Sequence, residues 1–270
     1  MVRDADVPPI EPLWPTSRPE SPPAEGEVQL WLADLDRPPV PFDELWATLD
    51  AEERERAARF RFEVHRRRFT AGRGLLRRFL GRLTGSEPQA LVFGYGAKGK
   101  PHLVRPREGL AGELRFNLSH SANGALFAVA RGRELGVDVE ALRPMDDAEA
   151  LVERFFHPAE RRTFAALAPE SRVTAFFSGW TRKEAYLKAR GDGLSLPTTE
   201  FEVALTTGGP LGLIGFDREP AEVGRWSFEA FEPAREFLGT VAIEGPPPKL
   251  RHAFWAPDQR PIPRSSAVSG

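Results

Sequence analysis

Residues 136–140 have the sequence Gly-Val-Asp-Val-Glu, so a single valine separates the two acids Asp138 and Glu140. On a β-strand the side chains of residues i and i+2 point to the same face, which would place both carboxylates together and both valines opposite them. Neighbouring carboxylates repel each other unless a cation lies between them, and Mg²⁺ prefers oxygen ligands and usually keeps water and substrate phosphates in its shell. The pattern therefore indicates either a divalent-metal site or an exposed strand edge with solvated acids.

The chain on both sides of this segment predicts an α+β fold in which the order strand, helices, strands occurs twice. Hydrophobic spacing, a capping pattern at Asp50 and Glu53, Pro158 at a helix start and Gly191 at a helix end locate the elements. We expect helices over residues 51–60, 64–83, 148–156, 158–167 and 171–189. We expect strands over residues 28–33, 91–93, 114–118, 201–205, 226–231 and 237–243, and a hairpin formed by residues 125–130 and 135–139.

The composition is that of a soluble globular protein, with 270 residues of which 41% are hydrophobic and 28% charged. This length leaves room for two lobes, each with a core of its own. Residues 1–26 and 246–270 are rich in proline and predict flexible tails. We expect an N-terminal α+β half over residues 27–134 and a C-terminal α+β half over residues 135–245, the second of which carries the paired acids.

The overall composition also excludes several kinds of chemistry. The chain has no cysteine, which rules out disulfides, thiolate metal sites and a cysteine nucleophile. Its net charge of -2 gives no general attraction to nucleic acid. The N-terminus lacks the pattern of a signal peptide, and no apolar run reaches about 18 residues. We therefore expect a cytoplasmic protein that binds neither nucleic acid nor a membrane.

Residues 180–188, Trp-Thr-Arg-Lys-Glu-Ala-Tyr-Leu-Lys, form a second group of reactive side chains inside an expected helix. Trp180, Glu184 and Lys188 follow helical spacing and would share one face. Glu184 and Lys188 could be only a surface ion pair, which stabilises a helix weakly. Alternatively, Glu184 is a third oxygen ligand or a general base, and Lys188 contacts a phosphate. Spacing alone leaves both interpretations open.

Residues 115–121, Arg-Phe-Asn-Leu-Ser-His-Ser, lie at the end of an expected strand. Ser119 and His120 could suggest a nucleophile with its base, but neighbours on extended backbone point to opposite sides, and no nucleophile-elbow pattern surrounds the serine. A hydroxyl, an imidazole and free backbone N–H groups at a strand end are better suited to holding a phosphate. The other interpretation is a turn serine beside a half-buried histidine.

The chain is strongly basic between residues 54 and 82, where only Glu55 and Glu63 oppose the arginines. Such a bias usually marks a solvated helix face, although arginine forks also match the geometry of phosphate. Lys98 and Lys100, in the sequence Lys-Gly-Lys-Pro, add two ammonium groups on a loop. Together these residues could form a polyphosphate site. The arginines are Arg54, Arg56, Arg59, Arg61, Arg66, Arg67, Arg68, Arg73, Arg77, Arg78 and Arg82.

Taken together and in this order, residues 99–101, 116–121, 136–140 and 180–188 resemble the motifs of the surfactin-synthetase-activating (Sfp) type of 4'-phosphopantetheinyl transferase. The resemblance covers about residues 27–205, and it includes the Arg-Phe-Phe sequence that ends at Phe156 and the turn after Gly191. Two positions depart from the family pattern. Phe69 lies where some relatives have a threonine that touches the nucleotide, and His157 replaces a serine-like residue at a helix start.

The resemblance implies a monomer built as a pseudo-dimer of two similar α+β halves, with coenzyme A in the cleft between them. Asp138, Glu140 and Glu184 match the metal-binding acids of the family, with Mg²⁺ as the expected ion and Mn²⁺ as the alternative. The residues that would contact coenzyme A are Arg56, Lys98, Lys100, Pro101, Asn117, Ser119, His120, Asp138 and Lys188.

The implied activity is transfer of the 4'-phosphopantetheine group of coenzyme A to a serine of an apo acyl, peptidyl or aryl carrier protein. Glu184, or a water that it holds, would take the serine proton, and Lys188 would stabilise the leaving phosphate, so these two are the expected catalytic residues. Such carriers serve fatty-acid, polyketide or nonribosomal-peptide assembly. Two other functions could use the same residues: a Mg²⁺-dependent phosphohydrolase and a non-catalytic coenzyme A-binding module.

Overall fold

The computed structural model describes residues 8–106, 109–191, 193–206 and 211–256. Its helices are α1 (Phe42–Thr48), α2 (Ala51–Ala58), α3 (Glu63–Thr84), α4 (Leu110–Glu113), α5 (Ala148–Phe155), α6 (Pro158–Ala165) and α7 (Pro169–Arg190). Its strands are β1 (Thr16–Ser17), β2 (Glu27–Asp34), β3 (Val92–Tyr95), β4 (Pro101–Arg105), β5 (Leu114–Ser121), β6 (Gly124–Arg131), β7 (Leu135–Ala141), β8 (Phe201–Val203), β9 (Leu213–Phe216), β10 (Trp226–Phe231), β11 (Phe237–Glu244) and β12 (Lys249–Trp255). This mixture confirms the predicted α+β class.

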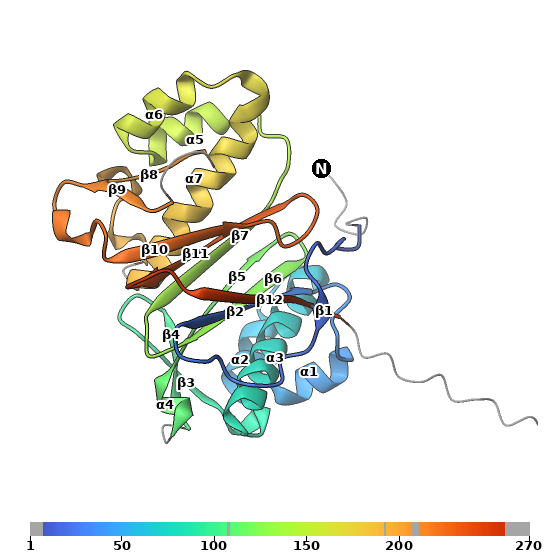
Figure 1. Ribbon diagram of the computed structural model, residues 1–270. Helices are drawn as coiled ribbons and strands as arrows, with labels where there is room; N and C mark the ends of the chain where they lie inside the picture. Colours follow the sequence, from blue (N-terminus) through green and yellow to red (C-terminus); the bar gives the residue numbers. More distant parts are fainter. Residues whose placement is uncertain (1–7, 107–108, 192, 207–210, 257–270) are drawn as a thin grey trace, which may run out of the picture.

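The strands form two main sheets that bury a common hydrophobic cluster between them. The first sheet has the order β1-β12-β2-β6-β5, and the second has the order β10-β11-β7. Two smaller sheets pair β3 with β4 and β8 with β9. Figure 1 shows the main sheets in the middle of the molecule, with α1, α2 and α3 on one side and α5, α6 and α7 on the other. The molecule is therefore layered as helices, sheet, sheet, helices.

Strand β2 shows how the sequence produces these layers. Trp31 packs with Phe79 of α3 in a cluster on one side of the first sheet. Leu30 points the other way, into the cluster between the sheets, together with Val137 and Val241 of the second sheet. Since successive side chains of a strand alternate between faces, β2 must be apolar on both of them, as its sequence is.

The two longest helices begin and end within two residues of their predicted bounds. Gly85 ends α3 with φ 68°, and Gly191 ends α7 with φ 77°, a left-handed conformation that favours glycine. Asp50 and Glu53 form a reciprocal capping box at the start of α2. The sequence signals for these helices are therefore confirmed.

The predicted hairpin between residues 125–130 and 135–139 is wrong. Both segments are strands, but β6 pairs with β2 on one side and β5 on the other, while β7 pairs with β11 in the second sheet. Both edges of β6 are thus occupied, and alternation of apolar residues predicts a strand without predicting its partner. Helix α1 and strands β4 and β9 were not predicted, because each is too short for a clear period.

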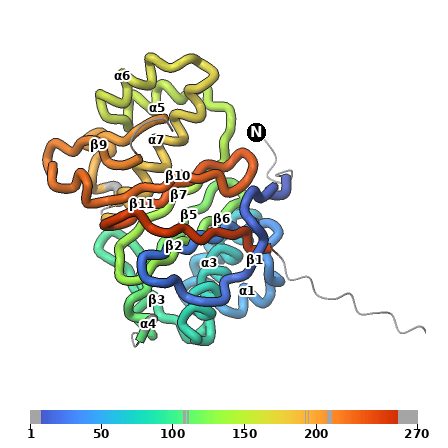
Figure 2. The backbone as a smooth tube through the Cα atoms, viewed as in Figure 1, coloured from blue at the N-terminus to red at the C-terminus, as the bar shows by residue number. Residues whose placement is uncertain are grey.

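The predicted flexible tails over residues 1–26 and 246–270 are wrong where the structure describes them. β12 lies between β1 and β2 and pairs in parallel with both. Near the other end, Ile10 and Trp14 are buried in the cluster between the sheets. Figure 2 shows the N-terminal segment, in blue, beside the red C-terminal strand. Long-range contacts order these proline-rich segments, which local composition cannot reveal. Residues 1–7 and 257–270 lie outside the described residues.

Candidate active site

Helix α7 reaches the strand that carries the paired acids because the two elements pack without a side chain between them. A Cβ at Gly136 of β7 would overlap backbone atoms of Ala185 and Ala189 of α7, so only glycine allows this approach. The polar residues of the helix motif, Glu184 and Lys188, therefore lie beside the polar face of β7. The helix and the strand together build one site.

Asp138 is the most enclosed of the expected metal ligands, with 4% of its surface exposed. Its Oδ1 accepts hydrogen bonds from Lys188 Nζ at 2.6 Å and from Ser119 Oγ at 2.7 Å. The same ammonium lies 3.1 Å from Ser119 Oγ. Asp138 Oδ2 is buried and has no hydrogen-bond partner among the described residues. Such an oxygen is costly to bury, and a cation could satisfy it.

Glu140 and Glu184 are half-buried, and their electrostatics also favour a cation. Burial raises the pKa of the Glu140 carboxyl above its ordinary value, and nearby Asp138 adds to this shift. Burial likewise raises the pKa of Glu184, which Asp138 and Glu140 raise further and Lys188 opposes. Glu140 and Glu184, whose charged forms are destabilised in this way, are together with Asp138 a chemically suitable set of oxygen donors for Mg²⁺.

The three acids fit Mg²⁺ by chemistry, but they do not form a closed ligand set as they stand. In the ranges that the structure describes, no three Asp, Glu, His or Cys side chains are grouped closely enough to hold an ion. Lys188 occupies one oxygen of Asp138 instead. Metal binding would therefore require the Lys188 ammonium and the Glu184 carboxylate to shift, while Asp138 and Glu140 stay bonded to β5.

A row of polar side chains joins β5 to β7 where the two main sheets meet. Asn117 Oδ1 accepts the Val137 amide at 2.9 Å. Two residues further on, Ser119 Oγ accepts the Val139 amide at 3.4 Å, and Ser121 Oγ accepts the Ala141 amide at 3.1 Å. Alternate residues of β5 thus satisfy alternate amides of β7. Asn117, expected at the coenzyme A site, also holds the strands together.

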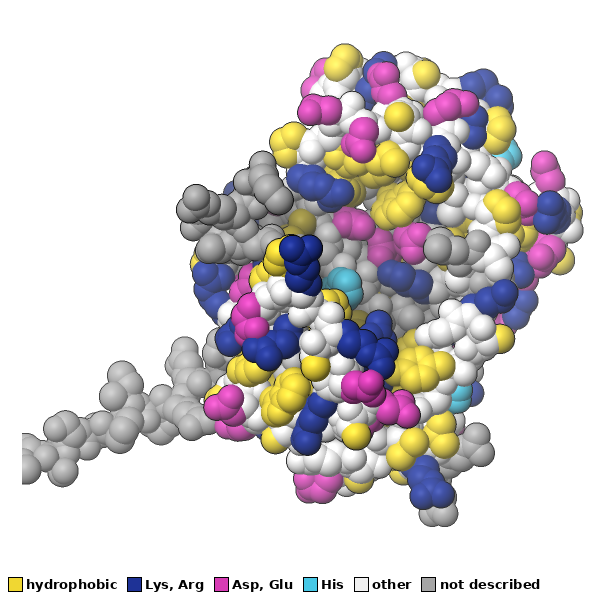
Figure 3. Space-filling view, turned by 180° about the vertical axis from the view of Figure 1, so that it is seen from behind, with side chains coloured by type: hydrophobic (Ala, Val, Ile, Leu, Met, Phe, Trp, Pro, Cys, Tyr) yellow, Lys and Arg dark blue, Asp and Glu magenta, His cyan; other side chains and the backbone are white. Residues whose placement is uncertain are grey.

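A cleft of about 1230 Å³ opens beside this row of side chains. Four residues that were expected to contact coenzyme A line it, namely Arg56, Pro101, Asn117 and His120. Figure 3 shows this side of the molecule from behind, with a hollow bordered by acidic and basic side chains and a histidine. The volume is large enough for a ligand of nucleotide size. Sequence reasoning missed further lining residues, which come from separate elements without common spacing: Phe60, His65 and Tyr95.

His120 lies open at the cleft wall, yet its surroundings disfavour its charged form. Partial burial lowers the pKa of the imidazole below its usual value, and the Lys188 ammonium lowers it further. The side chain is therefore predominantly neutral at pH 7. A neutral imidazole beside a free cleft can gain a proton when a phosphate arrives.

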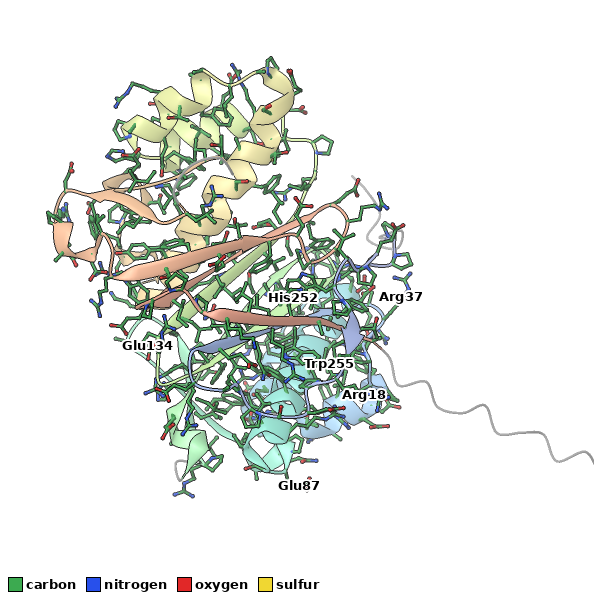
Figure 4. The ribbon with its side chains drawn as sticks, viewed as in Figure 1. Arg18, Arg37, Glu87, Glu134, His252 and Trp255 are labelled. Carbon is green, nitrogen blue, oxygen red and sulfur yellow. The ribbon has the colours of Figure 1, made fainter. Side chains whose placement is uncertain are left out.

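Lys98 and Lys100 do not line this cleft. Lys100 Nζ instead donates to Glu134 Oε2 at 2.7 Å and to the Ala189 carbonyl at 2.8 Å, near the C-terminus of α7. Glu134, labelled in Figure 4, also accepts from Arg115 Nε at 2.9 Å. Lys98 is exposed on the loop before β4. The structure thus gives Lys100 a role in holding the end of α7.

Most of the arginines expected to form a polyphosphate cluster are engaged in ion pairs. Arg77 is fully buried and bonds to Glu53 and Asp50, and Arg68 makes two hydrogen bonds of 2.8 Å to Asp36. Four of these arginines nevertheless line the cleft, namely Arg56, Arg59, Arg68 and Arg73, so a polyphosphate site there stays a prediction. The Arg56 guanidinium lies 5.2 Å from the ring centre of Phe69, and Phe69 packs against Phe60. Phe69 therefore presents an aromatic surface at the cleft.

Lys183, which belongs to the same helix motif, is fully buried on the other side of α7. Its Nζ donates to the carbonyls of Thr198 and Phe201, each at 2.7 Å, and pairs with Glu160 at 2.9 Å. Burial lowers the pKa of Lys183 to about 8. Glu160 also accepts the amide of His157, which caps α6, so the histidine departure affects a helix start as predicted. These contacts anchor the face of α7 that points away from β7.

Comparison with known proteins identifies the family to which this chain belongs. A family model described as 4'-phosphopantetheinyl transferase superfamily matches residues 134–242, and another described as 4'-phosphopantetheinyl transferase, N-terminal, matches residues 39–131. The 4'-phosphopantetheinyl transferase HetI from Nostoc is 45% identical over 219 residues, which are 81% of this chain and 88% of HetI. The chain therefore belongs to the 4'-phosphopantetheinyl transferase family.

Two further proteins extend this comparison. A 4'-phosphopantetheinyl transferase from Bacillus subtilis is 30% identical over 171 residues, which are 63% of this chain and 73% of the relative. A holo-(acyl-carrier-protein) synthase from Bacillus anthracis, solved in complex with CoA, covers 42% of this chain and 96% of its own length at 24% identity and a TM-score of 0.32. The structural overlap is too small to bear on the fold.

Among the residues that the structure places, no helix is long and apolar enough to cross a membrane.

Proposed function

We propose that this protein transfers the 4'-phosphopantetheine group of coenzyme A to a serine of an apo carrier protein and releases 3',5'-ADP. Family membership supports this activity, because the relatives are named for it. The structural observation that supports it best is the buried Oδ2 of Asp138, which lacks a partner in the described ranges and lies beside two further carboxylates and an open cleft. This arrangement suits a reaction in which charged phosphates meet a cation and a proton acceptor.

Asp138, Glu140 and Glu184 would hold Mg²⁺, or Mn²⁺ in its place. When bound, the ion would neutralise part of the negative charge of the coenzyme A pyrophosphate. The protein contributes the buried position of Asp138 and the rigid contact between α7 and β7, both of which are in place before substrate arrives. Positioning of this kind supplies much of the rate enhancement in phosphoryl transfer.

Glu184 is the proposed proton acceptor. The serine oxygen of the carrier attacks the β-phosphorus, its bond to phosphorus forms, and the bond to the oxygen of 3',5'-ADP breaks. The serine proton passes to Glu184, directly or through a water. Burial raises the pKa of Glu184, which makes its carboxylate a stronger base than an exposed one. Lys188 would stabilise the charge on the leaving phosphate.

Arg56, Pro101, Asn117, Ser119 and His120 are the proposed contacts of coenzyme A along the cleft. Four of them line it, and the hydroxyl of Ser119 joins Asp138 to Lys188. Asp138 and Lys188 do not line the cleft either, but they are joined to Ser119 beside it and stay proposed contacts. Lys98 and Lys100 are weaker candidates, because Lys100 bonds instead to Glu134 and the Ala189 carbonyl, and Lys98 lies on the exposed loop before β4.

Further proposals concern the subtype of the enzyme, its location and the division of the chain into halves. We propose an Sfp-type enzyme that acts in the cytoplasm as a monomer on acyl, peptidyl or aryl carriers, with halves over residues 27–134 and 135–245. The separate family matches to residues 39–131 and 134–242 support that boundary. Strand β12 supports a modified plan in which the N-terminal half also includes a strand from the end of the chain.

The test is intact-mass spectrometry of apo acyl, peptidyl and aryl carrier proteins after incubation with the full chain, coenzyme A and Mg²⁺. A mass gain of one phosphopantetheine that EDTA abolishes would support the proposal and rank the carriers. Hydrolysed coenzyme A without carrier modification would indicate the phosphohydrolase. Tight coenzyme A binding with neither product would indicate a non-catalytic binding module.

A further inference from the structure

Ser121 is a polar residue at the edge of the site to which no role in metal or coenzyme A binding was assigned. It ends β5 and faces Glu140 of β7. Its Oγ donates a hydrogen bond of 2.5 Å to Glu140 Oε2 and accepts one of 3.1 Å from the Ala141 amide. The residue also lines the cleft, so it connects the strand, the acid and the open space where a ligand would enter.

The two hydrogen bonds together fix the direction of the hydroxyl. A serine hydroxyl has one proton to donate and two lone pairs that accept. Because the Ala141 amide is held in the β7 backbone, its N–H occupies a lone pair, and the single proton is left for Glu140. Among the described residues, the Glu140 carboxylate makes its hydrogen bond through Oε2, which leaves Oε1 available.

The same geometry recurs two residues earlier. Ser119 Oγ donates to Asp138 Oδ1 and accepts the Val139 amide, while Asp138 Oδ2 has no partner among the residues that the structure describes. Two serines at i and i+2 on β5 thus each hold one oxygen of the acids at i and i+2 on β7. In both acids the second oxygen is left for another ligand.

We propose that Ser121 is a positioning residue of the metal site: it holds Glu140 through Oε2 so that Oε1 is presented to the cation. The inference rests on the proposed function in that the cation is the Mg²⁺ of the transferase. Groups that orient metal ligands in this way commonly change metal affinity by about 10- to 100-fold when they are removed.

The experiment is a Mg²⁺ titration of the full chain without coenzyme A. The melting temperature is measured at each Mg²⁺ concentration. We expect Ser121→Ala to raise the Mg²⁺ concentration that gives half of the maximal stabilisation by about tenfold or more. Ser121→Thr keeps the hydroxyl and should remain close to the wild type. Ser227→Ala is the matched control, because Ser227 is also half-buried on a strand and donates a 2.6 Å hydrogen bond to the Gly245 carbonyl. It should leave the Mg²⁺ midpoint unchanged.

A Ser121→Ala midpoint equal to that of the wild type would overturn the proposal, and so would a wild type that Mg²⁺ does not stabilise. If the alanine variant does not fold, Ser121→Cys provides the same test, because a thiol fills the site but is a weak donor. Carrier modification is measured separately. A wild type that modifies no carrier but shows a Mg²⁺ midpoint dependent on Ser121 would contradict the proposed function and support this inference.

Discussion

The two oxygens of Asp138 have unequal surroundings. Oδ1 shares Lys188 and Ser119, while Oδ2 is buried without a partner among the described residues. Lys188 therefore serves as an internal counter-charge in the protein without substrate. A cation bound at Oδ2 would weaken the attraction between the Asp138 carboxylate and the Lys188 ammonium. The ammonium would then be available to a phosphate.

Glu184→Gln tests the proton acceptor. The amide keeps the shape of the side chain but cannot take a proton, so carrier modification should fall by about 100-fold or more. The measurement is the initial rate at saturating coenzyme A and Mg²⁺. Glu229→Gln, a half-exposed glutamate of β10, is the matched control and should keep the wild-type rate. A Glu184→Gln rate within a few-fold of the wild type would remove Glu184 from this role.

His120 gives a prediction for pH. Its pKa is lowered in the folded protein, so the folded state binds a proton less readily than the unfolded chain, and stability is lost as pH falls through and below about 6.5. His120→Gln should lose less stability between pH 7 and pH 5. In the wild type, coenzyme A phosphates near the imidazole should raise its pKa. NMR titration of the imidazole with and without coenzyme A measures this shift, and an unchanged value would place the phosphates elsewhere.

For single residues, the sequence predicts which side chains share a face of a strand or helix, because this depends only on local spacing. Asp138 and Glu140 share a face because strands have a period of two, and Glu184 and Lys188 lie together because of helical spacing. The partners of Lys100 could not be predicted, because the end of α7 lies far from it in the sequence. The role of Ser121 likewise depends on β5 and β7 meeting side by side.

The contact between α7 and β7 is the element-scale feature on which the site depends. Gly136→Ala would place a methyl group against the backbone of Ala185 and Ala189, which cannot move without shifting the helix. We expect a loss of about 1–3 kcal/mol in the free energy of unfolding and a slower transfer, because Glu184 and Lys188 move with α7.

Urea unfolding and the carrier assay together check the glycine prediction. Gly212→Ala is the control, since a Cβ there meets no atom within 4 Å. Equal stability and activity of the two variants would show that α7 does not need this close approach.

Elements were predicted best where one period continues for many residues. α3 and α7 each span 22 residues with an αL glycine at the end, and both were found from sequence. Pairing was predicted poorly: β6 and β7 are adjacent in sequence but belong to different sheets. Strand partners depend on contacts between distant segments, which a local pattern does not contain.

At the scale of the whole molecule, segments near both ends of the chain pack against segments that are distant in the sequence. The N-terminal segment bonds to the second sheet's hairpin, with the Leu13 amide 3.1 Å from the Pro233 carbonyl, while β12 completes the first sheet. Trp255 of β12 is 1% exposed and packs near Phe79 and Phe127. The cluster between α3 and the first sheet and the cluster between the two sheets therefore both include residues from the ends of the sequence.

Trp255→Ala tests the importance of this crossing. Removing a fully buried tryptophan should cost about 3–5 kcal/mol of unfolding free energy, and deletion of residues 246–270 should prevent cooperative folding. Urea denaturation measures both. Trp46→Ala removes a half-buried tryptophan of α1 and should cost less. If Trp255→Ala were no more harmful than Trp46→Ala, β12 would not be an integral part of the first sheet.

The position of β12 also has a consequence for protein synthesis. On the ribosome, β2 emerges early, but β12, which pairs with one of its edges, is translated more than 200 residues later. Until then the nascent chain exposes an unpaired strand edge, which is the kind of surface that other chains can join. We therefore expect newly made chains to depend on chaperones for longer than their length would suggest.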